Sequence, residues 1–100
     1  MMTRLQALLG KVSEECHETG QRALKAQKFG LFQTQPGHTD DNAKRLRDEL
    51  NDLKVAIMLI EELTGADLHT MTFEEEADRR QRVEKYMVLA ANLGMVDLHS

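Results

Sequence analysis

Two pairs of acidic residues have a spacing that could hold a metal ion. Glu15 stands three residues before Glu18, with Glu14 preceding them, and Glu49 stands three residues before Asp52. On a helix, residues three apart share one face, so each pair would present two carboxylates side by side. Clustered carboxylates repel one another, and partial burial increases that cost. A hard cation with oxygen ligands relieves the repulsion, and Mg²⁺ is often shared between protein carboxylates and substrate phosphates.

The same stretch carries basic residues after the first acidic pair. Arg22 lies four residues after Glu18, Lys25 lies seven residues after it, and Lys28 lies about one turn further on. Charged donors of this kind bind phosphate oxygens strongly. Acidic residues that hold a metal, followed by cations on the same side of a helix, make a layout suited to a chain of phosphates. We therefore expect Arg22, Lys25 and Lys28 to bind phosphate.

Composition and apolar spacing predict that helices position these residues. The chain has a single proline and is rich in strong helix formers. Apolar residues recur at intervals of three and four, the period of one helix face. They predict helices over about residues 3–29, 41–63 and 72–93, with a tail at 94–100. On the first helix, the stripe expected to be buried is Leu5, Leu8, Leu9, Val12, Cys16, Thr19, Ala23 and Ala26. Within it, Cys16 is expected to be a small buried hydrophobic residue.

Short breaks separate the three predicted helices. Gly30 is a plausible helix stop, and Pro36-Gly37 is typical of a turn. Thr72 followed by Glu75 has the spacing of a capping box. The first connection favours antiparallel packing of the first two helices. Because each acidic pair borders the predicted apolar stripe, the two pairs can then face each other across the groove between the helices.

The length of the chain limits how complete such a fold is. One hundred residues make a single domain, residues 1–100. Three helices form an incomplete bundle, and two copies would make a more complete one. Residues 55–60 are apolar nearly all round, which predicts burial in a core or against a partner chain. The expected fold is an all-α antiparallel helical bundle with three main helices per chain, completed as a homodimer or homotetramer.

Charge and composition exclude several classes of function. The formal net charge is −4, which disfavours nucleic-acid binding because phosphate contacts need clustered cations. Four aromatic residues and no Trp leave few platforms for stacking bases of a single strand. No apolar run approaches the roughly 18 residues of a membrane span, so no membrane contact is expected. The single Cys16 fits a reducing compartment, and we expect the cytoplasm.

The acidic residues also match the motif of a known family. Glu14-Glu15-x-x-Glu18 followed by Glu49-x-x-Asp52 resembles the EExxE…ExxD signature of MazG-like nucleotide pyrophosphohydrolases, within the all-α NTP pyrophosphatase superfamily. The resemblance covers about residues 3–64, and the stretches 22–26, 29–30 and 42–46 also look like MazG-like proteins. The 30 residues between the two halves of the motif (positions 19–48) are at or beyond the long end of the family's usual gap.

The resemblance implies a reaction and a division of roles. It implies hydrolysis of a nucleoside triphosphate to the monophosphate and pyrophosphate, in a cleft completed by a second subunit. The metal ligands would be Glu15, Glu18, Glu49 and Asp52, holding Mg²⁺, for which Mn²⁺ is a possible substitute. Either Glu14 or Glu15 would orient the attacking water or take its proton. The residues that flank this site in sequence and could contact the base are Phe29, Phe32 and Asn42.

Three other interpretations fit the same residues. The same fold and metal site could act on a different phosphoanhydride substrate, such as a modified or deoxy nucleotide. The chain could be a helical interaction module whose acidic groove no longer catalyses, and it would then bind Mg²⁺ no better than a control with scrambled carboxylates. Glu14-x-x-His17 also matches the Glu-x-x-His element of di-iron bundles. That interpretation predicts retained iron and a visible absorption band, which a magnesium enzyme would lack.

Overall fold

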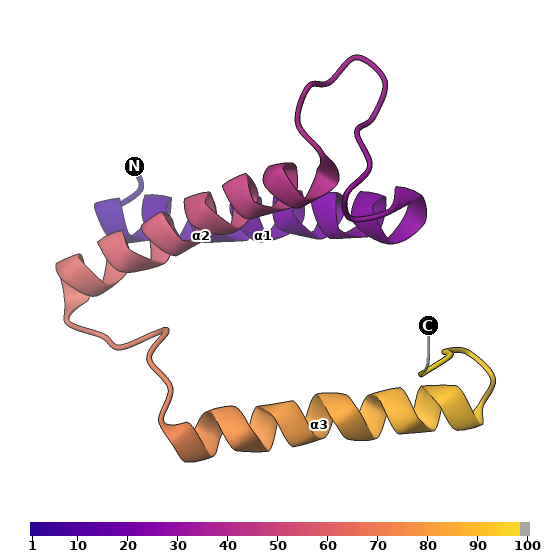
Figure 1. Ribbon diagram of the computed structural model, residues 1–100. Coiled ribbons are helices and arrows are strands. Elements are labelled where there is room, and N and C mark those ends of the chain that lie inside the picture. The colour runs from indigo at the N-terminus through magenta and orange to yellow at the C-terminus, as the bar shows by residue number, and fades with distance from the viewer. Residues whose placement is uncertain (99–100) are drawn as a thin grey trace. The chain divides into compact units, whose positions relative to one another are not determined.

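A computed structural model describes residues 1–98 of the chain. It contains the helices α1 (Arg4–Phe29), α2 (Asn42–Thr64) and α3 (Phe73–Asn92) and, within the described residues, no strand (Figure 1). The prediction of an all-α chain with three helices is confirmed, and each helix end agrees with its predicted position to within one residue. The chain divides into two compact units, Met1–Leu68 and a second unit that begins at His69.

The helix starts are fixed by side-chain caps. Thr3 Oγ1 accepts from the Gln6 amide at 3.1 Å, and Gln6 Oε1 accepts from the Thr3 amide at 2.9 Å. Thr72 and Glu75 form the same reciprocal pair at the start of α3, so the predicted capping box is confirmed. Each pair satisfies two backbone N–H groups that have no partner inside the helix. Gly65, with a φ of 75°, takes the left-handed conformation that ends α2.

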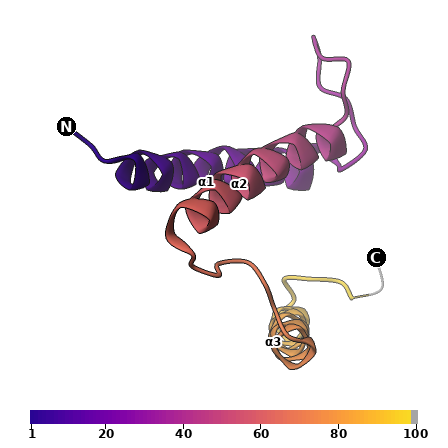
Figure 2. The same ribbon diagram turned by 90° about the vertical axis from the view of Figure 1, so that its left-hand side faces the viewer.

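The first unit is a pair of helices. Helices α1 and α2 lie side by side and run in opposite directions, as both views show (Figures 1 and 2). Ala56 and Ile60 of α2 are its buried apolar residues. The face of α1 in the contact carries Glu15, which is 3 % exposed, and the half-buried Leu8, Val12, Glu18, Thr19 and Arg22.

The prediction that Cys16 is buried is wrong, since this thiol is exposed. Leu9 and Ala23, from the same predicted stripe, are exposed as well. Successive residues turn by about 100° around a helix, so a contact face centred on Glu15 points its neighbour Cys16 away from α2. The carboxylate therefore occupies the contact between the helices, where the apolar pattern placed it only at the border.

Backbone hydrogen bonds hold the connection between α1 and α2 against the start of α2. The Ala43 amide donates to the Leu31 carbonyl at 2.7 Å, and the Asn42 amide donates to the Gln33 carbonyl at 2.9 Å. An isolated bridge between Thr34 and Asp41 adds to these contacts.

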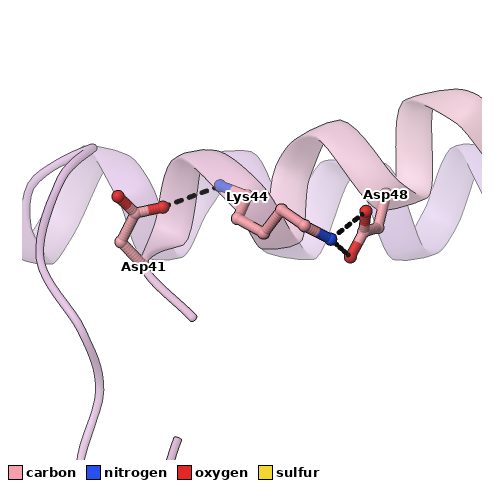
Figure 3. A network of polar contacts seen from close by, with 3 residues as sticks. All are labelled: Asp41, Lys44 and Asp48. Carbon is pink, nitrogen blue, oxygen red and sulfur yellow. Dashed lines mark hydrogen bonds and ion pairs between the residues drawn. The ribbon is translucent and has the colours of Figure 1, made fainter. Parts of the chain in front are cut away.

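Asp41 caps α2. Its Oδ1 accepts from the Lys44 amide at 2.8 Å (Figure 3). The Lys44 ammonium in turn lies 2.7 Å from both carboxylate oxygens of Asp48, one turn further along α2 (Figure 3). The connection is thus an ordered loop that fixes where α2 begins.

The second unit consists of α3 and the residues that follow it. The Met95 amide donates to the Ala90 carbonyl at 2.8 Å, so the chain turns back at the end of the helix, and Ala90 is buried. Of the predicted tail 94–100, residues 99–100 lie outside the described part of the chain. Among the described helices, none combines the length and apolar character needed to cross a membrane.

Candidate metal and phosphate site

The contact between α1 and α2 brings three of the four predicted metal ligands together. Glu15 and Glu18 of α1 and Glu49 of α2 each offer a carboxylate oxygen, and these oxygens all lie within 4.8 Å of one another. We call these three residues the acidic group. Glu15 is buried, and Glu18 and Glu49 are half-buried. The fourth predicted ligand, Asp52, is exposed and lies outside the acidic group, although it shares a pocket with Glu15.

Two carboxylates of the acidic group are each paired with a cation on one oxygen only. Glu15 Oε1 lies 3.0 Å from Lys11 Nζ, and Glu49 Oε1 lies 3.8 Å from Arg22 Nε. The second oxygens, Glu15 Oε2 and Glu49 Oε2, are buried and have no hydrogen-bond partner within residues 1–98. We call them the two open oxygens. A buried polar atom without a partner is costly, and each such case in a folded chain needs an explanation.

The acidic group holds more negative charge than its surroundings stabilise. Burial raises the pKa of the Glu49 carboxyl above its usual range, and the neighbouring carboxyls of Glu18 and Glu15 raise this pKa further. A bound cation would favour the charged form of the Glu49 carboxyl. It would therefore counteract the effects of burial and of the neighbouring carboxyls on this pKa. The two open oxygens are hard oxygen donors of the kind that Mg²⁺ takes in proteins. The donor set therefore fits the predicted cation.

The acidic group does not include the two residues of the di-iron interpretation. Glu14 is exposed, and its Oε1 lies 3.4 Å from Lys11 Nζ. His17 is exposed too. Of the predicted catalytic pair, Glu15 thus lies inside the group, whereas Glu14 lies next to it on the outer side of α1.

The three predicted phosphate-binding cations extend from the acidic group toward the loop. Arg22 is half-buried beside Glu49. Lys25 lines a pocket of about 440 Å³ together with Phe29 and the loop residues Gln33, Thr34, Gln35 and Pro36. We call this the loop pocket. Lys28 places its ammonium 5.3 Å from the centre of the Phe29 ring, a cation–π contact.

The three residues predicted to contact the base have different environments. Phe29 lines the loop pocket. Phe32 is 76 % exposed and does not line that pocket. Asn42 is 3 % exposed, and its side-chain Nδ2 donates to the Gly30 carbonyl at 2.9 Å, so the side chain ties the loop to the start of α2. A base contact by these residues stays a prediction.

Sequence reasoning missed Lys11 and Thr19. Lys11 stands four residues before Glu15, the spacing of a helical ion pair, so its position beside the motif was a usable signal. Thr19 was assigned to the apolar stripe. Its hydroxyl oxygen is buried one turn after Glu15 and, among the residues that the structure describes, makes no hydrogen bond. This hydroxyl is a further polar atom beside the acidic group.

A second pocket, of about 350 Å³, was also missed. Its apolar lining comes from both helices, with Leu8 from α1 and Val55, Ala56 and Leu59 from α2. Its charged lining is Lys11, Glu15 and Asp52. We call it the interhelix pocket. It was not visible in the sequence because its residues lie on two separate stretches that only the packing of α1 on α2 brings together.

Comparison of the chain with protein-family models, curated proteins and solved structures finds no match. The resemblance of the acidic motif to the MazG-like signature therefore remains a prediction.

Proposed function

We propose that this chain is a MazG-like, Mg²⁺-dependent nucleoside triphosphate pyrophosphohydrolase that releases a nucleoside monophosphate and pyrophosphate. The observation that supports the proposal most is the pair of buried open oxygens on Glu15 and Glu49, two carboxylates that form one group with Glu18. While both carboxylates are charged, no group among the described residues pairs with these oxygens, and an unpaired buried oxygen destabilises a helix contact. A role in binding a divalent cation explains both.

The cation would be held by Glu15, Glu18 and Glu49, with Asp52 as the fourth ligand of the proposed set. These are oxygen donors only, which favours Mg²⁺, with Mn²⁺ as a substitute. When bound, such a cation neutralises charge on phosphate oxygens and makes a water molecule more acidic.

The chain's own residues supply binding and proton transfer. Arg22, Lys25 and Lys28 would hold the phosphates, since they lead away from the acidic group along α1. A water oxygen forms a bond to the α-phosphorus while the bond from that phosphorus to the pyrophosphate oxygen breaks. Glu14 or Glu15 takes the water proton. No covalent enzyme intermediate is needed, because positioning and electrostatics carry most of such catalysis.

A second copy of the chain would complete the fold in this proposal, as a homodimer or homotetramer. Within the first unit, α2 exposes Leu50 and Met58 to solvent. Covering such residues contributes about 25 cal/mol per Å² of apolar surface buried. A reducing cytoplasm remains the expected compartment, since Cys16 is a free, exposed thiol.

Pyrophosphate release from a panel of ribo- and deoxyribonucleoside triphosphates, with Mg²⁺ and with EDTA, tests the proposal. We expect release of pyrophosphate and monophosphate in equal amounts, dependent on the metal and lost in Glu49→Gln. Absence of turnover of every triphosphate, together with Mg²⁺ binding no tighter than in a control with scrambled carboxylates, would favour the non-catalytic helical module instead. Turnover by Glu49→Gln at the rate of the unchanged chain would contradict the proposed site.

A further inference from the structure

Two pockets flank the acidic group on opposite sides along α1. The interhelix pocket takes Leu8 and Lys11 from α1, on the N-terminal side of Glu15. The loop pocket takes Lys25 and Phe29 from α1, on the C-terminal side of Glu18. At 1.5 Å per residue, Lys11 and Lys25 stand about 21 Å apart along the helix axis. A nucleotide whose reacting phosphate lies at the acidic group would extend toward both pockets, with its nucleoside in one of them.

The loop side carries the positive charge. Arg22 and Lys25 follow the acidic group, and Lys28 lies over the ring of Phe29. The ammonium of Lys28 therefore covers a face of the only aromatic ring that lines the loop pocket. Three cations in succession suit the pyrophosphate, which carries most of the negative charge of a nucleoside triphosphate.

The interhelix pocket has the opposite character. Its walls are apolar, formed by Leu8, Val55, Ala56 and Leu59. Its one cation, Lys11, already lies 3.4 Å from Glu14 and 3.0 Å from Glu15. The carboxylates of Glu15 and Asp52, both proposed ligands of the cation, complete the lining, so this pocket offers no free cation of the chain to the pyrophosphate. Apolar walls with a few polar groups fit a flat, uncharged ring whose edge can accept or donate hydrogen bonds.

We infer that the interhelix pocket binds the nucleoside end of the substrate, while the outgoing pyrophosphate leaves on the loop side. Apolar side chains of Val55 and Leu59 contact the nucleoside, and the Lys11 ammonium donates to an acceptor on it. This inference rests on the proposed function and deepens it. It assigns the base to a pocket other than the one that Phe29 lines.

Substitution of Val55 by Trp tests the inference, because Val55 lines the pocket and is 54 % exposed. Leu63→Trp is the matched control, since Leu63 is 47 % exposed on the same helix outside that pocket. Calorimetry would measure binding of dAMP, dCMP, dGMP and dTMP, and separately of pyrophosphate, in the presence of Mg²⁺. We expect Val55→Trp to weaken monophosphate binding about tenfold or more and to leave pyrophosphate binding within about twofold. Leu63→Trp should change neither.

If Val55→Trp perturbs the fold, a measurement on the unchanged chain still tests the inference. In amide NMR spectra, the bound monophosphate should shift the signals of Val55 and Ala56, and pyrophosphate should shift those around Lys25. Monophosphate shifts confined to residues 33–36, or no shifts in the interhelix pocket at millimolar nucleotide, would overturn the inference.

The outcomes also separate this inference from the proposed function. If the unchanged chain releases pyrophosphate but Val55→Trp leaves monophosphate binding intact, only the placement of the nucleoside is wrong. If Val55→Trp dissociates an oligomer without weakening monophosphate binding, a second copy of the chain fills the pocket and the inference is also wrong. If no triphosphate is hydrolysed by the unchanged chain, the proposed function itself fails.

Discussion

The ammonium of Lys11 lies 3.0 Å from Glu15 Oε1, while Glu15 Oε2 stays buried and unpaired among residues 1–98. Lys11 is half-exposed, whereas the Glu15 side chain is 4 % exposed. The carboxylates of Glu15 and Glu14 raise the pKa of Lys11 above its usual range, so the ammonium stays charged beside them. Lys11 thus compensates one oxygen of a buried carboxylate and leaves the other available.

Lys11→Met is expected to lower the Tm of the metal-free chain, because it leaves the charge of a buried carboxylate without its partner. Lys44→Met is a matched control. The Lys11 and Lys44 side chains are both 51 % exposed, but Lys44 pairs with Asp48, which is 50 % exposed. An exposed ion pair contributes little, so Lys44→Met should change the Tm much less. Thermal unfolding followed by circular dichroism in EDTA would show this difference, and equal losses in the two variants would contradict it.

Glu49→Gln is expected to stabilise the metal-free chain at neutral pH. Since burial and its carboxylate neighbours raise the pKa of Glu49, the folded chain retains this proton to a higher pH than the unfolded chain. The resulting stability is fully present below the usual carboxyl range and is lost as the pH rises through the raised pKa. Glutamine mimics the protonated form at every pH and avoids that loss.

Urea unfolding in EDTA, at several pH values between about 4 and 8, would measure this effect. The unchanged chain and Glu49→Gln should have similar stability at the acid end and diverge as the pH rises. Glu62→Gln, a change at an exposed residue of the same helix, is the control. A constant difference between Glu49→Gln and the unchanged chain across the range would argue against the raised pKa.

Substitutions at the proposed ligands are expected to remove metal binding and activity together. Glu15→Gln, Glu18→Gln, Glu49→Gln and Asp52→Asn should each reduce Mg²⁺ affinity and pyrophosphate release by about a hundredfold or more, because each removes a charged oxygen donor. Glu14→Gln should retain Mg²⁺ affinity, since Glu14 lies outside the acidic group. Calorimetry with Mg²⁺ and a pyrophosphate assay would be combined on all five variants. Retained affinity in Asp52→Asn would restrict the ligands to the acidic group.

Asn42→Ala is expected to act on stability as well as on any substrate binding. The Asn42 side chain donates to the Gly30 carbonyl at 2.9 Å and is buried at the start of α2. Losing this bond should lower the free energy of unfolding by about 1–2 kcal/mol. Urea unfolding would measure the loss, and KM would be compared in parallel. A raised KM without any loss of stability would instead support the direct base contact that the sequence predicts for Asn42.

The sequence was informative wherever a pattern is local to one helix. The capping residues Thr72 and Glu75 and the period of the apolar residues predicted the helices, because both depend on neighbours within one or two turns. The motif spacing predicted that two pairs of carboxylates face each other across two helices. Glu15, Glu18 and Glu49 lie together in this way, whereas Asp52 is exposed and lies outside the acidic group. The predicted burial of Cys16 was wrong because an argument from apolar periodicity assumes that the apolar face of a helix is the buried one. Here a carboxylate occupies it.

Features that depend on how the helices pack against each other could not be predicted from the sequence. The interhelix pocket exists because Leu8 of α1 meets Val55 and Leu59 of α2, and no residue type in either stretch marks it. The buried hydroxyl of Thr19 and the role of Asn42 in holding the loop also depend on neighbours distant in sequence. Whether a polar atom is buried depends on the residues that pack over it. The residue pattern of one helix carries no information about those residues.

The location of the acidic group at the contact of two helices has a consequence for folding. A cation bound by Glu15 and Glu49 would join residues far apart in the chain, and because the unfolded chain does not hold these carboxylates together, its binding free energy would add to the stability of the fold. Ligand binding to the folded state alone adds about 2.7 kcal/mol of stability at a concentration 100 times Kd. The fraction of folded chains would then rise with the concentration of free Mg²⁺.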